Sequence, residues 1–265
     1  MVAETMGGDR AARGFWDRDW GWLVFGLSIA ILGVTGLAYA NFLPGQPAPK
    51  WLPARVPLSF AANLFMAAAG LAIAWRRTAA WGALALAVYY GLLVVALMDG
   101  RMIARNAGVF MAYSNTAEQL AILAGALIVW ADRALLAPGR AALIARAGQV
   151  LFGVCAVLFG GAHFAYMNFT APLVPDWLPP SQLFWGYATG VFHILGGLAI
   201  IVGVRARLAA ILLTVMYAAW TPMVHLPLII AHPGDFGHWI ENGANLVLTG
   251  AAWVVADSLR KAPSP

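Results

Sequence analysis

Long apolar stretches with almost no charged residues recur along the whole chain, and they constrain the fold more than any other feature. Eight of them approach the length of about 20 residues that an α-helix needs to cross the hydrocarbon layer of a membrane. They cover residues 20–42, 57–75, 78–98, 116–131, 147–169, 182–203, 208–230 and 238–257. The chain is 62% hydrophobic and 10% charged, which is more apolar surface than one soluble core can bury. The sequence therefore predicts an all-α membrane protein with about eight transmembrane helices in the lipid bilayer.

Lys and Arg are unevenly divided between the two sides of this predicted topology. Twelve of them fall in the N-terminal segment, the second, fourth and sixth connections and the C-terminal tail. The other four connections carry only Lys50, Arg55, Arg101 and Arg105. The positive-inside bias then predicts both termini in the cytoplasm of a bacterial-type inner (plasma) membrane. The net charge of +5 follows from this topology, and no continuous basic patch indicates nucleic acid as a partner.

The chain repeats itself at an offset of about 127 residues. Matched pairs include Tyr39 with Tyr166, Trp51 with Trp177, Gly70 with Gly197, and Glu118 with Glu241. Because each half has an even number of spans, the halves are expected to be four-helix bundles related in parallel by an axis along the membrane normal. The predicted organisation is a cytoplasmic N-terminal segment (1–19), a first repeat (20–133), a cytoplasmic linker (134–146), a second repeat (147–258) and a cytoplasmic tail (259–265). We see no removable signal peptide and expect the first span to remain as an anchor.

The two halves differ in their chemistry. All five histidines lie in the second half, at His163, His193, His225, His232 and His238. The first-half positions that correspond to His163 and His193 are Gly36 and Met66. This asymmetry predicts that the first repeat is a scaffold and the second repeat carries the site.

His193 and Glu241 are the candidate catalytic residues. His193 is the deepest polar group of the second half, about 15 Å inside its helix end against about 9 Å for His163, and a lipid-facing histidine would be costly. Either residue is a ligand or proton acceptor, or a hydrogen-bonded packing histidine. Glu241 shares a helix face with His238 and Asn245 and is either a site residue or a first-turn glutamate favoured by the helix dipole. The candidate cofactor-binding residues are His163, His193, His225, Glu241 and Asn245.

Other features narrow the chemistry further. Pro222, Pro227 and Pro233 predict a kinked or broken seventh span, whose freed carbonyls either line a cavity or belong to a plain kink. The single cysteine, Cys155, cannot form an intrachain disulfide or a redox pair and is expected to be a small buried residue. No phosphate-binding glycine motif, HExxH motif or nucleophile elbow is present.

The second half resembles the DoxX/DoxD family of small four-helix membrane proteins. The resemblance rests on GGAHF at 160–164, VPDWLPP at 174–180, TGVFHILGGLAIIVGVRARLAAILL at 189–213, and the start of the last helix at Glu241 and Asn242. The first half matches through PKWLP and AAGLAIAWRRTAA, so the chain resembles a tandem duplication of the four-helix unit. The family typically has Glu where this chain has His193. Members include the membrane subunit of a thiosulfate:quinone oxidoreductase, so the resemblance implies a quinone-linked or redox accessory role.

Three functions remain open from the sequence. The first is a quinone-interacting or redox accessory subunit, in which His163, His193, His225 and Glu241 contact the quinone or relay protons and an external redox partner supplies electrons. The second is a metal or haem protein, because several histidines lie near one side of the membrane. Which residues would bind the metal is left open. The third is a small-molecule carrier, lipid-binding or assembly protein without catalysis. Whether the chain is an enzyme is left open.

Overall fold

The computed structural model describes residues 19–260, and these residues contain helices and no strand. The first half consists of α1 (Gly21–Tyr39), α2 (Arg55–Ala74), α3 (Ala79–Val88), the π-helical η2 (Tyr89–Asp99), α4 (Gly100–Arg105) and α5 (Phe110–Arg133). The second half begins with α6 (Pro138–Ala165), α7 (Met167–Thr170), the 3-10 turn η3 (Ala171–Leu173) and α8 (Gln182–Val202). It ends with α9 (Ala206–Trp220), the π-helical η4 (Thr221–His225), α10 (Leu226–Ala231) and α11 (Phe236–Ser258). The predicted N-terminal segment and tail lie almost wholly outside the described residues.

Six helical segments in the described part are long and apolar enough to cross a membrane. They are α1, α2, the continuous segment Ala79–Arg105, α6, α8 and the continuous segment Ala206–Ala231. The all-helical membrane class is therefore confirmed, whereas the predicted number of eight spans is not. The two long helices that fall short are α5 and α11, which include polar residues such as Gln119 and Asn245. Both residues are buried against protein, where lipid does not select for apolar side chains.

The helices of the two halves interlock. Each half packs its own helices in chain order, α1 on α2, α2 on α3 and α3 on α5, then α6 on α8, α8 on α9 and α9 on α11. The first helix of each half also packs on the last helix of the other half, because α1 contacts α11 and α6 contacts α5. The two last helices, α5 and α11, contact one another. The predicted arrangement as two parallel-related four-helix bundles is not confirmed by these contacts, which run through both halves without a break.

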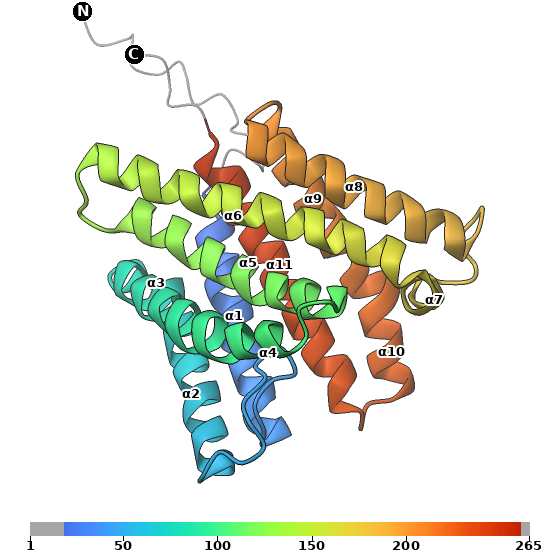
Figure 1. Ribbon diagram of the computed structural model, residues 1–265. Helices are drawn as coiled ribbons and strands as arrows, with labels where there is room; N and C mark the ends of the chain where they lie inside the picture. Colours follow the sequence, from blue (N-terminus) through green and yellow to red (C-terminus); the bar gives the residue numbers. More distant parts are fainter. Residues whose placement is uncertain (1–18, 261–265) are drawn as a thin grey trace, which may run out of the picture.

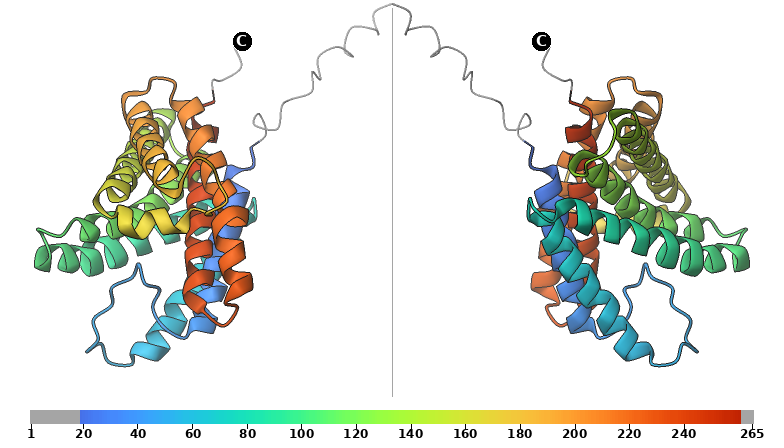
Figure 2. Two further views of the ribbon diagram at one scale, coloured as in Figure 1. Left: turned by 90° about the vertical axis from the view of Figure 1, so that its right-hand side faces the viewer. Right: turned by 90° about the vertical axis from the view of Figure 1, so that its left-hand side faces the viewer.

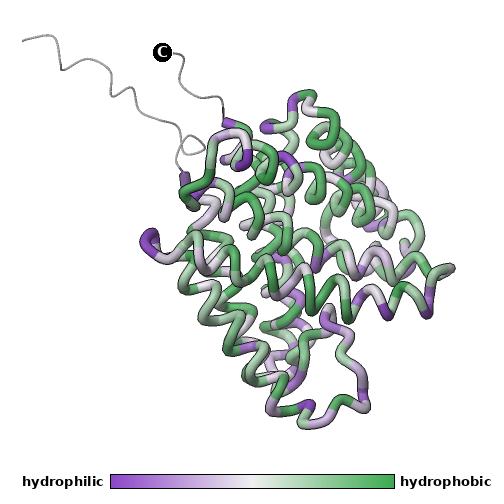
Figure 3. Tube along the Cα trace, turned by 60° about the vertical axis from the view of Figure 1, so that its left-hand side comes forward, coloured by the Kyte–Doolittle hydropathy of each residue, from purple (hydrophilic) through white to green (hydrophobic). Residues whose placement is uncertain are grey.

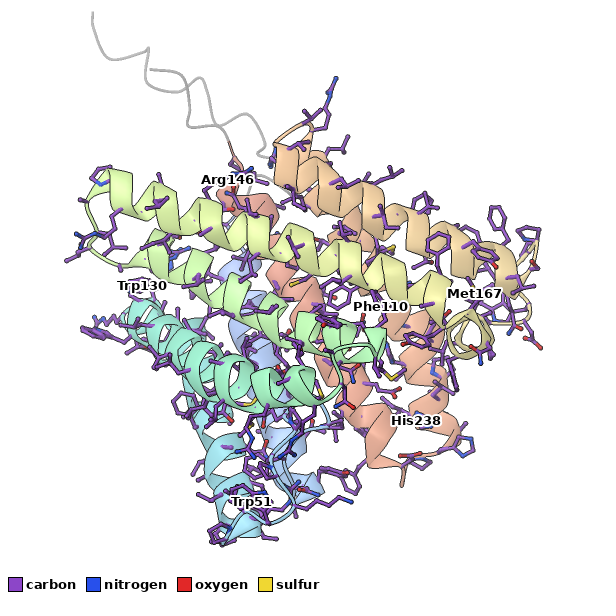
Figure 4. All side chains as sticks on the ribbon, viewed as in Figure 1. Trp51, Phe110, Trp130, Arg146, Met167 and His238 are labelled. Atoms are coloured by element: carbon purple, nitrogen blue, oxygen red, sulfur yellow. The ribbon has the colours of Figure 1, made fainter. Side chains whose placement is uncertain are left out.

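The long helices run in two main directions. In Figure 1, α1 and α2 run up and down and α11 slopes between them and the right-hand side, while α5, α6 and α8 lie closer to the horizontal. Figure 4 labels residues at several helix ends: Trp130 and Arg146 lie toward the upper left, and Trp51, Met167 and His238 lie toward the bottom and right. The sequence assigns the ends near Trp130 and Arg146 to the cytoplasmic side and the ends near Trp51, Met167 and His238 to the outer side.

Glycines bring the first two helices of each half into close contact, and they do so at corresponding positions. A Cβ atom at Gly26 or Gly70 would lie under 3.0 Å from the carbonyl of the other, so α1 and α2 touch backbone to backbone. Gly153 and Gly197 oppose one another in the same way between α6 and α8. Small residues allow such close approach between membrane helices. The equivalent interfaces support the repeat at the level of packing.

The outer surface of the helices is apolar. Leu64, Leu92 and Leu195 are each at least 60% exposed, which is typical of side chains that face lipid. Figure 3 shows hydrophobic residues along the long helices and hydrophilic ones mainly at their ends and connections. Trp51 and Trp177, the matched tryptophans of the two repeats, are 67% and 68% exposed, as expected for an interfacial belt.

Ionic contacts tie the start of α1 to the end of α11. The backbone N–H of Gly21 donates to the Asp257 carboxylate at 2.8 Å, which satisfies one of the free donors of the first turn of α1. Arg133 and Arg260 both pair with Asp19. The described ends of the chain therefore lie side by side.

Candidate functional site

His163 of α6 and His193 of α8 lie against one another inside the second half. Their ring centroids are 5.4 Å apart with 29° between the ring planes. His193 is 1% exposed, and His163 is half-buried. The sequence places these residues at different depths, yet their rings meet, because α6 and α8 pack antiparallel and each side chain leans toward the start of its own helix. The structure therefore joins two of the predicted site residues in one pair.

Glycine makes this pairing possible. A Cβ atom at Gly160 would lie 2.6 Å from the carbonyl oxygen of Gly190, and one at Gly190 would lie 2.9 Å from the Cβ of His163. Without side chains at these two positions, α6 and α8 approach closely enough for their imidazoles to stack. The glycines in GGAHF and TGVFH thus act on the site through the helix spacing.

Aromatic side chains surround the histidine pair. The ring of His193 lies 5.4 Å from Tyr217, 5.8 Å from Trp220 and 6.0 Å from Phe159, measured between centroids. His163 lies 6.0 Å from Trp220. Tyr217 and Trp220 come from α9, so three helices of the second half build the site. We call these five residues the histidine–aromatic cluster.

The hydrogen bonding leaves imidazole nitrogens unused. His193 Nδ1 lies 2.9 Å from the Thr189 carbonyl, which can only accept, so Nδ1 carries the proton and Nε2 presents a lone pair. His163 interacts with the backbone of Gly186, and its Nδ1 is buried with no hydrogen-bond partner among the described residues. The hydroxyl of Tyr217 is also buried and unpaired there. A buried polar atom without a partner is costly, and this cost points to a ligand or water that completes the cluster.

Asn245 has a structural partner rather than an open face. Pro222, at the start of η4, has no N–H, so a carbonyl about one turn earlier lacks its helical donor. The Asn245 amide donates to the Tyr217 carbonyl at 2.9 Å and to the Thr221 hydroxyl at 3.1 Å. The predicted disruption of the seventh span is a π-helical segment, and the Asn245 amide holds the last turn of α9 and the first residue of η4 together. Through Tyr217, Asn245 positions one wall of the histidine–aromatic cluster.

The structure does not bring Glu241 or His225 to this cluster. Glu241 is exposed and acts electrostatically on Glu118, its counterpart in the first repeat. His225 lies in η4, where its buried Nδ1 is unpaired and His238 acts on it electrostatically. His238 and His232 have ring centroids 5.9 Å apart. The five histidines thus form two groups, the pair of His163 and His193 and a second set near the turn before α11, where Figure 4 labels His238.

No group of three or more His, Cys, Asp or Glu side chains within residues 19–260 is arranged to hold a metal ion. The stacked rings of His163 and His193 present their faces, rather than their nitrogens, to one another. The single cysteine, Cys155, is fully buried in the core.

Sequence reasoning missed several buried polar groups in the first half, which it treated as a scaffold. Asp99, the only acidic residue of the continuous segment Ala79–Arg105, is 1% exposed, and neither carboxylate oxygen has a partner among the described residues. Gln46 Oε1 and Asn63 Oδ1 are likewise buried and unpaired. The hydroxyl of Tyr90 donates to the sulfur of Met66 at 3.6 Å. Tyr90 corresponds to Tyr217 in the second repeat, and Met66 corresponds to His193. The repeat could have pointed to these residues, because Tyr90 and Tyr217 stand 127 residues apart, which is the offset of the repeat.

Comparison with known protein families gives a match over part of the chain. Residues 152–233 match a family described as a domain of unknown function (DUF8561). The chain matches no curated protein and no solved structure. The matched segment contains every residue of the histidine–aromatic cluster and ends before α11, so it excludes Glu241 and Asn245.

Proposed function

We propose that this chain is a DoxX-like inner-membrane protein whose second repeat binds the headgroup of a quinol, as an accessory subunit of a quinone-linked redox system. The observation that carries the proposal is the buried His163–His193 pair with unused imidazole nitrogens among aromatic rings.

The chemistry of the cluster suits such a headgroup. A quinol has two O–H donors on a flat ring, and the lone pairs on His193 Nε2 and His163 Nδ1 are acceptors. Tyr217 and Trp220 offer aromatic faces for packing against the ring. On quinol oxidation, the imidazoles would take up the two protons while the two electrons pass to a partner, because ordinary side chains do not accept them. An external redox partner is therefore part of the proposal.

The proposal extends to topology. Eight spans, with α5 and α11 crossing as interior helices, place both termini in the cytoplasm. The ion pair between Asp19 and Arg260, at the two described ends of the chain, supports an even number of crossings.

A second candidate function is a small-molecule carrier, lipid-binding or assembly protein without catalysis. It is favoured by the π-helical segments η2 and η4, which interrupt the third long helix of each half, and by unpaired buried polar groups in both halves. Such π-helical segments are frequent at functional sites and are places where a helix bends.

The decisive experiment is to purify the protein in mild detergent and measure the quinone in its lipid extract by mass spectrometry. His193→Met is the best variant, because methionine is the residue at the corresponding position, Met66, and packs there against Tyr90. We expect bound quinone in the wild type and a loss of about tenfold or more in His193→Met. Met66→Leu is the matched control, since it changes a buried residue of the other repeat and should leave the quinone in place. A wild-type protein without quinone, or full retention in His193→Met, would reject the proposal and favour the carrier.

A further inference from the structure

A pocket of about 310 Å³ lies in the first half, far along the chain from the histidines. Its walls come from the connection between α1 and α2 and from the outer end of the segment Ala79–Arg105. Figures 1 and 2 both show this connection rising from the ends of α1 and α2 toward α4. The lining residues are Pro47, Pro49, Trp51, Leu52, Leu97, Met98, Arg101, Met102, Arg105 and Asn106.

The pocket joins apolar walls to two arginines. The guanidinium of Arg101 lies 5.6 Å from the ring centroid of Trp51, and Arg105 follows one helical turn later. Leu97 is 53% exposed and lies one turn before Arg101, on the side of η2 where Leu93 is also exposed. A ligand in this pocket therefore meets positive charge at one end and a lipid-facing apolar surface at the other.

The charge here is unusual for this side of the protein. The predicted outer connections carry only four basic residues, and two of them line the pocket. A third, Lys50, stands between the lining residues Pro49 and Trp51. The fourth, Arg55, donates to the Ala48 and Pro49 carbonyls at 2.7 and 3.1 Å and so holds the loop in shape.

The two lining arginines are free to bind an anion. Neither Arg101 nor Arg105 has a carboxylate within ion-pair distance in residues 19–260. Arginine forks match the oxygens of a phosphate, and a positive-inside topology gives no reason to gather them on the outer side.

We propose that this pocket binds an anionic glycerophospholipid of the outer leaflet. The phosphate lies between Arg101 and Arg105, and an acyl chain runs along Leu97 and Leu93. The site is independent of the histidine–aromatic cluster and of the quinol proposal.

Native mass spectrometry of the purified full chain with defined lipids tests this site. With equal amounts of phosphatidylglycerol and phosphatidylcholine, we expect the wild type to retain phosphatidylglycerol preferentially. Arg101→Gln/Arg105→Gln should weaken that retention roughly ten- to thirtyfold, as expected for the loss of two interfacial charges. Arg101→Lys/Arg105→Lys keeps the charge without the forked geometry and should give an intermediate loss.

The matched control removes two exposed arginines from the opposite side, Arg77→Gln/Arg140→Gln, and should bind phosphatidylglycerol like the wild type. Equal retention of both lipids by the wild type would overturn the proposal. So would undiminished retention in the glutamine pair, or displacement of the phospholipid by free palmitate at equal concentration.

Discussion

Asn245 of α11 and Tyr217 of α9 are joined by a hydrogen bond of 2.9 Å from the side-chain amide to the backbone carbonyl. The bond ties α11 to the last turn of α9, just before Pro222, and it fixes the residue whose ring faces His193. One interaction thus links the irregular seventh helical segment, the last helix and the histidine–aromatic cluster.

Asn245→Ala should therefore destabilise the protein. The substitution removes the two hydrogen bonds that the amide donates to the Tyr217 carbonyl and the Thr221 hydroxyl, which costs about 1–3 kcal/mol. We expect a lower midpoint of thermal unfolding in detergent, measured by circular dichroism, together with weaker retention of any ligand at the cluster. Asn115→Ala, at an exposed position of α5, is the control and should leave the midpoint unchanged or slightly raised. Equal midpoints for Asn245→Ala and the wild type would mean that the bond contributes nothing.

Asp99→Leu should have the opposite effect on stability. Both carboxylate oxygens of Asp99 are buried without a partner among the described residues, so the wild-type protein carries the cost of desolvating them. Removing that polar group should stabilise the fold by about 1–3 kcal/mol, seen as a higher unfolding midpoint. Asp176→Leu, at an exposed position in the connection before α8, controls for the general effect of replacing an acid by leucine. A lower midpoint for Asp99→Leu alone would indicate that a bound ion or water completes the carboxylate.

The sequence predicts the helices well because their apolar lengths and polar ends are local properties. The sequence predicts that the third span ends near Met98, whereas the helical segment continues to Arg105. Backbone hydrogen bonding does not stop where charged residues begin. The meeting of His163 with His193 could not be derived, because it depends on the register in which α6 and α8 pack, which the glycine contacts set in three dimensions. Tyr217 escaped notice for a similar reason: a tyrosine in an apolar span is equally consistent with core packing. Asp99 falls just after the predicted third span, 78–98, and so in a predicted connection.

Glycine contacts give a test of the repeat that is independent of any ligand. A side chain at Gly70 or at Gly197 would meet the backbone of the neighbouring helix at under 3.0 Å. Gly70→Leu and Gly197→Leu should each separate a helix pair and cost about 1–3 kcal/mol or more, visible as lower unfolding midpoints or poor yield. Gly139→Leu is the control, because a Cβ atom there meets nothing within 4 Å. If only one of the two core substitutions were harmful, the interfaces would not be equivalent.

Single-cysteine labelling can decide whether α5 crosses the membrane. Cys155 is the single cysteine of the chain and is buried, so Cys155→Ala provides a background without thiols. Gly108 precedes α5 and Gly139 follows it, and a Cβ atom at either position meets nothing within 4 Å. If α5 spans, a membrane-impermeant maleimide added to intact spheroplasts should label Gly108→Cys at once and Gly139→Cys only after lysis. Gly234→Cys, before α11, is expected to label like Gly108→Cys. Labelling of Gly108→Cys and Gly139→Cys from the same side would remove α5 from the membrane and reduce the number of spans, because α6 would then begin on the side where α4 ends.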